Sequence, residues 1–309
     1  MSGFQLNAVP VLSRTTLDRA EHLRSDEQAL KEGWGQAKLV RMTKRGQVRI
    51  ANGTVVLDAA TSLAAEPAPE AVFLGVDGAT HLWAVRDNDI DGDLADLRAV
   101  GVTLDLDDFG TGLLSTVIAL LNWHDKARFS AADGTPTVPS SAGWSRTSES
   151  GYEEFPRIDP AVICLVHDGG DRVLLARQHT WPQGLFSLLA GFVETGESLE
   201  RCVEREIREE VGVDVGEIRY LGSQPWPFPR SLMLGFTAVA DPAQPLTFHD
   251  GEITEAHWFT RAEVREALAA GSWGRDAAGE LDANTERRLL LPGSISIART
   301  IVESWAATD

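Results

Sequence analysis

The sequence predicts a mixed α/β fold, of the α+β kind, in more than one domain, and three observations lead to this class. The chain has 309 residues, which is long for a single domain. Short runs typical of β-strands alternate with stretches of helical spacing in both halves of the chain. Between the halves, residues 130–151 are rich in Ser, Thr, Pro, Gly and Ala, which is typical of a loop-rich connector.

Residues 1–125 are expected to form a mixed α/β domain. Asn52 and Gly53 lie between two apolar runs, and this pair is a strong signal for a β-hairpin. Helices are expected over Thr16–Gly33 and Thr111–Phe129, the second with Thr111 as a possible N-cap. Strands are expected over Leu39–Met42, Val48–Leu57, Ala71–Val76 and His81–Arg86.

The pattern becomes sharper after Pro156. Helices are expected over Ser198–Val211 and Ser294–Ala306. Strands are expected over Ala161–Val166, Arg172–Gln178, Ile218–Trp226 and Ser231–Ala240.

Composition and charge exclude several classes of protein. Hydrophobic residues make up 43% and charged residues 24%, as in an ordinary soluble globular protein. No run approaches the ~18 apolar residues of a membrane span, and the N-terminus lacks the features of a signal peptide. A net charge of −18 argues against non-specific binding to nucleic acids or membranes. It still allows small anionic substrates, because bound cations can reverse the field at one site.

The chain has two cysteines, Cys164 and Cys202, each among apolar residues. We expect two buried, reduced thiols and therefore a cytoplasmic protein. A disulfide framework and a thiolate-rich zinc site are excluded, since both need more cysteines.

The most informative segment is GFVETGESLERCVEREIREEVGV, from Gly191 to Val213. On a helix, Glu206, Glu209 and Glu210 project from one side because they are three or four residues apart. An apolar stripe lies beside them and two arginines lie opposite: Val203, Ile207 and Val211, and Arg201 and Arg208. Three neighbouring like charges repel unless a cation binds, and Mg²⁺ or Mn²⁺ prefers such oxygen ligands. These metals suit hydrolysis of phosphoanhydrides.

The residues before this helix also fit such a site. Gly191 and Gly196 would let the preceding loop bend tightly, and Ser198 is a plausible cap. A solvated acidic helix is the alternative for a single glutamate triplet, but the complete spacing argues against it.

This segment resembles the Nudix box, G-x5-E-x7-R-E-U-x-E-E-x-G-U with U aliphatic, position for position. The resemblance implies a Nudix fold for residues 158–309, with a mixed sheet sandwiched by helices, and a metal-dependent pyrophosphohydrolase activity. It also implies that Glu206, Glu209 and Glu210 hold the metals and that Arg205 orients a carboxylate. The backbone carbonyl of Ala190 would complete the metal shell.

A second motif, SQPWPFPRS at Ser223–Ser231, resembles the signature of the NADH pyrophosphatase branch. Its prolines predict a stiff, extended loop. Aromatic rings on such a loop offer flat surfaces to a base, while Gln224 and Ser231 could form hydrogen bonds with the base or the ribose. The alternative is that the aromatic loop packs as part of the core. The candidate substrate-binding residues here are Gln224, Pro225, Trp226, Pro227, Phe228, Pro229, Arg230 and Ser231.

The resemblance implies further site residues. The segment Asp250–Phe259 resembles a loop that contributes one more metal-binding glutamate, which would be Glu252, with Glu255 as the second choice. Ala298 would lie near the substrate. Phe155 and Phe192 would lie around the nicotinamide, although both phenylalanines are equally good core residues. Arg98 is a weaker candidate for a substrate contact.

One region departs from the branch, many members of which carry a four-cysteine zinc ribbon between the domains. Ser130, Asp133, Thr147 and Ser150 stand about where those cysteines would be. We therefore expect residues 126–157 to form a degenerate zinc-ribbon-like connector without structural zinc, held by packing of Trp144 and Phe129.

The resemblance implies cleavage of NADH or NAD⁺ at the central pyrophosphate, giving nicotinamide mononucleotide and AMP. It equally implies removal of NAD caps from RNA 5′ ends, and a homodimer. The alternatives are a hydrolase of ADP-ribose or nucleoside triphosphates, and a non-catalytic NAD(H) sensor.

Overall fold

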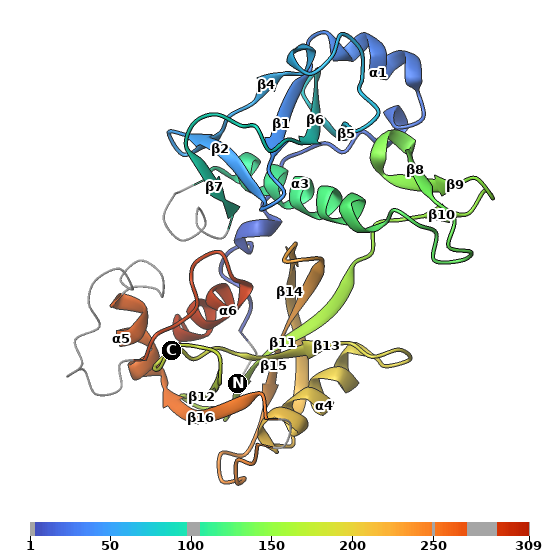
Figure 1. The fold of residues 1–309 in the computed structure, drawn as a ribbon. Coiled ribbons are helices and arrows are strands. Elements are labelled where there is room, and N and C mark those ends of the chain that lie inside the picture. The colour runs from blue at the N-terminus through green and yellow to red at the C-terminus, as the bar shows by residue number, and fades with distance from the viewer. Residues whose placement is uncertain (1–3, 98–105, 249–250, 271–288, 309) are drawn as a thin grey trace. The chain divides into compact units, whose positions relative to one another are not determined.

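The structure is a computed structural model, and it describes residues 4–97, 106–248, 251–270 and 289–308 (Figure 1). Arg98 lies outside the described residues. The chain forms two compact units, one of Met1–Ser13, Asp159–Pro225 and Ser231–Asp309, the other of Arg14–Ile158 and Trp226–Arg230. Both combine sheets with helices, so the predicted fold class is confirmed. In the described segments, no helix is both long enough and apolar enough to cross a bilayer.

The unit of Arg14–Ile158 contains a seven-stranded sheet in the order β3-β2-β1-β6-β5, with β4 beside β1 and β7 beside β2. Trp34, Phe73 and Trp83 form its aromatic core, with edge-on ring contacts at 5.0 and 5.3 Å. The strands are β1 (Lys38–Met42), β2 (Gln47–Ala51), β3 (Thr54–Val55), β4 (Asp58–Ala59), β5 (Val72–Asp77), β6 (Thr80–Arg86) and β7 (Leu94–Asp96). Its helices are α1 (Glu27–Trp34) and α3 (Asp108–Lys126).

The Asn52-Gly53 hairpin is confirmed. These residues join β2 to β3 with φ of 51° and 74°, and positive φ at both positions matches the twist of an antiparallel pair. The single strand expected over Val48–Leu57 is therefore two strands.

The helix predicted over Thr16–Gly33 is wrong before residue 27. Ala20 has left-handed backbone angles, and the Asp18 carbonyl accepts a hydrogen bond from Val76 N at 2.8 Å, so this stretch pairs with a strand. Helix α1 begins after Asp26, whose side chain caps it. The cap of α3 is likewise Asp107 rather than Thr111.

The connector is more regular than its composition predicts. It forms an antiparallel sheet of β8 (Thr137–Ser140), β9 (Ser145–Ser148) and β10 (Glu153–Glu154). Trp144 packs as expected, since its indole donates to Phe73 O at 2.7 Å and Arg24 lies 3.6 Å above its ring. Phe129 is 63% exposed, so the expectation that it holds the connector by packing is wrong.

Three of the four positions that match ribbon cysteines converge through hydrogen bonds. The Asp133 carboxylate accepts from the side chains of Ser150, Ser130 and Thr135 and from Thr135 N. These donors lower the pKa of Asp133 to about 2. Thr147 instead bonds Ser140, at 2.8 Å.

The other unit is built on a six-stranded sheet in the order β14-β15-β11-β12-β16, with β13 beside β11. β11 pairs in parallel with β15 and antiparallel with β12 and β13, so the sheet is mixed. The strands are β11 (Asp159–His167), β12 (Arg172–Gln178), β13 (Leu189–Phe192), β14 (Gly216–Trp226), β15 (Ser231–Val239) and β16 (Ile253–Thr260). The helices are α4 (Leu199–Val211), α5 (Arg261–Ala269) and α6 (Ile297–Ala306).

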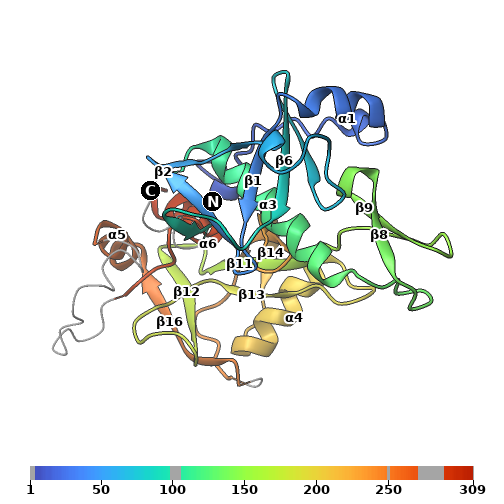
Figure 2. The same ribbon diagram turned by 45° about the horizontal axis from the view of Figure 1, so that its top comes forward.

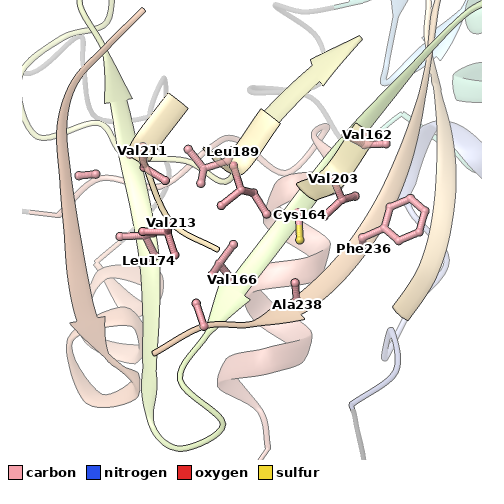
Figure 3. Close-up of a cluster of buried hydrophobic side chains, with 14 of the residues drawn as sticks. Val162, Cys164, Val166, Leu174, Leu189, Val203, Val211, Val213, Phe236 and Ala238 are labelled. Carbon is pink, nitrogen blue, oxygen red and sulfur yellow. The ribbon is translucent and has the colours of Figure 1, made fainter. Parts of the chain in front are cut away.

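Alternate residues of β11 enter two separate cores, because successive side chains on a strand point to opposite faces. Val162, Cys164 and Val166 pack with α4 residues Val203 and Val211, as Figure 3 shows. On the opposite face, Ile163 and Leu165 pack with residues of α6. The sheet is therefore sandwiched between α4 and α6, as predicted (Figures 1 and 2).

The sequence analysis did not predict β16 or α5, although a capping-box pattern in the sequence marks the start of α5. Thr260 and Glu263 form a capping box, in which each side chain bonds the backbone of the other residue. Helix α6 was predicted, but it begins three residues later than expected, after the cap Ser296.

We predict that Asp133→Ala lowers the thermal unfolding midpoint at pH 7, because it removes the acceptor that joins Ser130, Thr135 and Ser150. The pKa of Asp133 is depressed in the folded state, so its contribution is full above the unfolded pKa of about 3.9. It is lost as the pH falls through about 2. The midpoint difference between wild type and variant should therefore be smaller at pH 3 than at pH 7. Asp171→Ala, which changes another exposed aspartate, is the control; an unchanged difference at pH 3 would contradict the prediction.

Candidate active site

Helix α4 holds the predicted acidic residues at the border between core and solvent. The Ser198 side chain caps its N-terminus, as predicted, and Gly212 ends it with φ of 75°. The apolar stripe is buried, with Val203 and Val211 at 0% exposure and Ile207 at 1%. The opposite face is open, since the side chains of Arg201 and Arg208 are 75% and 63% exposed. The helix therefore has the amphipathic arrangement that its spacing predicts.

The three predicted metal ligands that lie on α4 differ in exposure along this border. The Glu209 side chain is 54% exposed and that of Glu206 is 15% exposed. Glu210 is 2% exposed and lies deepest. A buried carboxylate is costly unless it is paired or binds a cation.

Arg205 is the centre of the ion-pair network around these acids. Its Nε and Nη2 each lie 2.8 Å from a different oxygen of Glu197, which is a bidentate pair. Its Nη1 lies 2.8 Å from Glu206 Oε1 and 3.0 Å from Glu209 Oε2. Nη2 also donates to the Phe192 carbonyl at 2.9 Å. These contacts would let Arg205 orient a carboxylate, and that role stays a prediction.

The network shifts the proton affinities of its members in opposite directions. Hydrogen bonding from Arg205 lowers the pKa of Glu197 to about 2. Burial raises the pKa of Glu206, although Arg205 opposes this shift. Burial also raises the pKa of the Cys202 thiol to about 12, so Cys202 stays a neutral thiol beside the network. Both cysteines are free and buried, as predicted.

Gly191 leaves room for the Glu206 carboxylate. It lies in β13, and a Cβ added there would meet Glu206 Cδ at 1.9 Å and both carboxylate oxygens within 2.2 Å. Its backbone is not left-handed, so the expectation that Gly191 serves to bend the loop is wrong. That role falls to Gly196, whose φ is 88°. Gly191 is required because no side chain fits between β13 and this carboxylate.

The donor chemistry fits a hard divalent cation, since carboxylate oxygens lie beside β13, which also carries Ala190. In the part of the chain that the structure describes, no three His, Cys, Asp or Glu side chains form a group that could hold a metal ion. Instead, the Glu206 and Glu209 carboxylates both contact Arg205. The residues therefore suit such a cation in kind, and in this conformation the Arg205 guanidinium supplies the positive charge beside Glu206 and Glu209.

The two candidates for a further acidic ligand have different surroundings. Glu255 lies within β16, and its carboxylate is 3.3 Å from Arg177 on β12. Glu252 is exposed just before β16, and its backbone carbonyl accepts from His179 N at 3.2 Å. Glu252 stays the preferred prediction on the ground of the family resemblance.

The loop Ser223–Ser231 is extended only up to Trp226, where β14 ends, and residues 227–230 form a turn. The Trp226 and Phe228 rings meet edge-on at 5.0 Å and both are half-buried. Pro227 is buried and Ser231 is 9% exposed. The segment Trp226–Arg230 groups with the unit of Arg14–Ile158, whereas α4 belongs to the other unit.

Gln224 has a structural position that the sequence did not indicate. It is 0% exposed, its Oε1 accepts from Leu12 N at 3.3 Å, and its Nε2 donates to Ile295 O at 3.0 Å. The side chain thus joins segments near both ends of the chain. In this conformation its amide is already used, which argues against the predicted hydrogen bond to a base or ribose.

The remaining candidates divide between surface and core. Phe155 and Phe192 are 61% and 58% exposed, so the alternative that they are core residues is wrong. Ala298 is in the first turn of α6, is 1% exposed and packs in the core, and its N–H donates to Ser296 Oγ at 3.2 Å. Substrate contacts by these three residues stay predictions.

Sequence reasoning missed two partners of Arg205. Glu197 is a fixed position of the motif, so its importance could have been inferred, but not its bidentate contact across eight residues. The Phe192 carbonyl is a backbone group, and no sequence signal identifies it.

We predict that Gln224→Leu lowers the free energy of unfolding by about 2 kcal/mol, because it leaves Leu12 N–H and Ile295 C=O buried without a partner. Urea unfolding measures the change. The matched control is Gln244→Leu, since Gln244 forms the same pair of bonds to Asp214, at 2.9 and 3.0 Å, in a solvent-exposed setting. An equal loss of unfolding free energy in both variants would contradict the prediction, because it would show that burial of the Gln224 amide does not cause the destabilisation.

We predict that Gly191→Ala lowers phosphoanhydride hydrolysis by about 100-fold while the chain stays folded, because the new methyl displaces the Glu206 carboxylate. Steady-state kinetics and circular dichroism of the variant check this. Gly216→Ala is the control, because a Cβ at Gly216 meets nothing within 4 Å. Activity of Gly191→Ala within a few-fold of wild type would contradict the role assigned to Gly191.

Comparison with known proteins identifies the family of this chain. Residues 157–277 match the NUDIX domain family. The "NAD-capped RNA hydrolase NudC" of Mycobacterium bovis (strain BCG / Pasteur 1173P2) is 59% identical over 315 residues, which cover 99% of this chain and 97% of the relative. The protein of the same name from Mycobacterium tuberculosis (strain ATCC 25618 / H37Rv) gives the same identity and coverage.

A more distant relative is the "NAD(P)H pyrophosphatase NUDT13, mitochondrial" of Mus musculus. It is 40% identical over 206 residues, which cover 66% of this chain and 57% of that protein. The similarity extends from end to end of the chain and includes the glutamate motif of α4. This chain therefore belongs to the Nudix hydrolase family, in the branch of NADH pyrophosphatases and NAD-capped RNA hydrolases.

Proposed function

We propose that this chain hydrolyses the pyrophosphate bond of NADH and NAD⁺ to nicotinamide mononucleotide and AMP, and removes NAD caps from RNA 5′ ends. The observation that carries the proposal is the complete glutamate motif on α4, in a chain that aligns end to end with an NAD-capped RNA hydrolase. The two activities share one scissile bond, so a single site serves both.

The metal is a divalent cation, Mg²⁺ or Mn²⁺. Glu206, Glu209, Glu210 and Glu252, with the Ala190 carbonyl, would hold it, because these groups are hard oxygen donors. When bound, it would polarise a phosphoryl oxygen, lower the pKa of a water and neutralise the departing phosphate. No structural zinc is proposed, because Ser130, Asp133, Thr147 and Ser150 are not thiolate ligands.

Residues of the chain itself would take part in proton transfer, orientation and substrate binding. A water oxygen attacks one phosphorus, and the bond from that phosphorus to the bridging oxygen breaks. One of the three α4 glutamates accepts the water proton, and the bridging oxygen leaves with the other phosphate. Arg205 orients Glu206 and Glu209. Trp226 and Phe228, with Phe155 and Phe192, would contact the bases of the dinucleotide, since aromatic faces stack on planar rings.

We further propose that the protein works as a homodimer in the cytoplasm. The family resemblance supports the dimer, and two free, buried thiols fit a reducing compartment. The net charge of −18 favours free dinucleotide, or the short unpaired end of a capped RNA, over long-range capture of RNA.

We predict that wild-type protein with Mn²⁺ or Mg²⁺ releases AMP and NMNH from NADH, and that Glu210→Gln lowers the rate by about 100-fold or more, as expected for a group that supports charge in the transition state. Chromatography of the products measures the release. Glu200→Gln, an exposed glutamate in the first turn of α4, is the control and should keep its activity.

The same assay separates the alternatives. Hydrolysis of ADP-ribose or nucleoside triphosphates in preference to NADH would identify another Nudix activity. Binding of NADH without release of AMP, with either metal, would identify a sensor and contradict the proposed enzyme.

A further inference from the structure

Arg205 uses its two edges for different partners. The edge formed by Nε and Nη2 binds both oxygens of Glu197 at 2.8 Å, and Nη2 also donates to the Phe192 carbonyl at 2.9 Å. The remaining nitrogen, Nη1, bridges Glu206 at 2.8 Å and Glu209 at 3.0 Å. One edge is therefore an anchor, while Nη1 projects between two carboxylates.

Those two carboxylates are the ones that the proposed function assigns to the metal. We propose that Arg205 is the internal counter-ion of the metal-free site. Its Nη1 neutralises Glu206 and Glu209 when no metal is bound, and a divalent cation binds in competition with it. This inference rests on the proposed function, because it needs the same glutamates to be metal ligands.

The metal-free site needs such a cation. Carboxylates three or four residues apart on one helix face repel each other, and partial burial strengthens the repulsion. The other α4 arginines are engaged elsewhere, Arg201 with Glu204 and Arg208 with Asp214. In the described parts of the chain, Arg205 makes every ion pair that we find for Glu206 and Glu209.

The anchor determines what happens when a metal enters. Since Glu197 and the Phe192 carbonyl hold the guanidinium through Nε and Nη2, loss of the Nη1 contacts does not release the side chain. The positive charge stays close to the site, where it opposes a second cation. Arg205 thus stabilises the metal-free helix and weakens metal binding, two effects that a purely orienting arginine would not combine.

The test is calorimetric titration of the full chain with Mn²⁺ alone, comparing wild type, Arg205→Gln and Arg201→Gln, together with thermal unfolding in EDTA. We expect Arg205→Gln to bind Mn²⁺ at least about fivefold more tightly than wild type, since a nearby positive charge is removed. Its unfolding midpoint in EDTA should be lower, and the rise in midpoint on adding Mn²⁺ should be larger. Arg201→Gln removes an exposed arginine of the same helix and should change neither property.

Equal or weaker Mn²⁺ binding by Arg205→Gln, with wild type binding normally, would overturn the inference and leave the proposed function in place. Absence of binding by wild type would instead remove the proposed metal site, and the inference with it. If Arg205→Gln does not fold, nitrogen NMR of wild-type arginine side chains during Mg²⁺ titration decides. We expect the Arg205 Nη signals to shift more than its Nε signal; an unperturbed guanidinium would contradict competition.

Discussion

The packing of α4 against β11 is the constraint on which the site depends. Val203, Ile207 and Val211 are buried against alternate residues of β11, and this contact fixes the rotation of the helix about its axis. A helix turns about 100° per residue, so the rotation that buries these three residues also determines where the neighbouring glutamates lie. Glu210 is drawn almost entirely out of water, while Glu209 stays at the surface.

The charge of the site follows from this packing. Burial of carboxylates is unfavourable, and the chain offsets it with one guanidinium that touches Glu197, Glu206 and Glu209 together. The β13 strand completes the arrangement from the other side, because Gly191 has no side chain to exclude the Glu206 carboxylate. The site that we propose for a cation thus lies in a chain whose overall charge is −18.

The connector is a small sheet in which polar side chains, not metal-binding thiolates, are joined. Hydroxyl groups and the Asp133 carboxylate converge through hydrogen bonds at positions that we expect to match the cysteines of other members of the branch. Such bonds are individually weak, and the same connector also forms the three short paired strands β8, β9 and β10. Trp144 adds a partly buried contact, because its indole bonds the Phe73 carbonyl and the Arg24 guanidinium lies over its ring.

The sequence by itself determined the features that depend on local spacing. The motif from Gly191 to Val213 predicted the helix, its Ser198 cap and its exposed and buried faces, because helical periodicity converts sequence distance directly into direction. The strands were predicted from their own short apolar runs, and the Asn52-Gly53 turn from two residues that readily adopt positive φ.

Only the tertiary structure decided the contacts between segments far apart in the chain. Three contacts are of this kind. Gln224 is buried between Leu12 and Ile295. Asp18 pairs with Val76, which stops a helix before residue 27, and Gly191 leaves room for the Glu206 carboxylate. No periodicity encodes such contacts, because they depend on how whole elements pack in three dimensions. The same reason explains why the sequence identified Arg205 while the structure determined which carboxylates it binds.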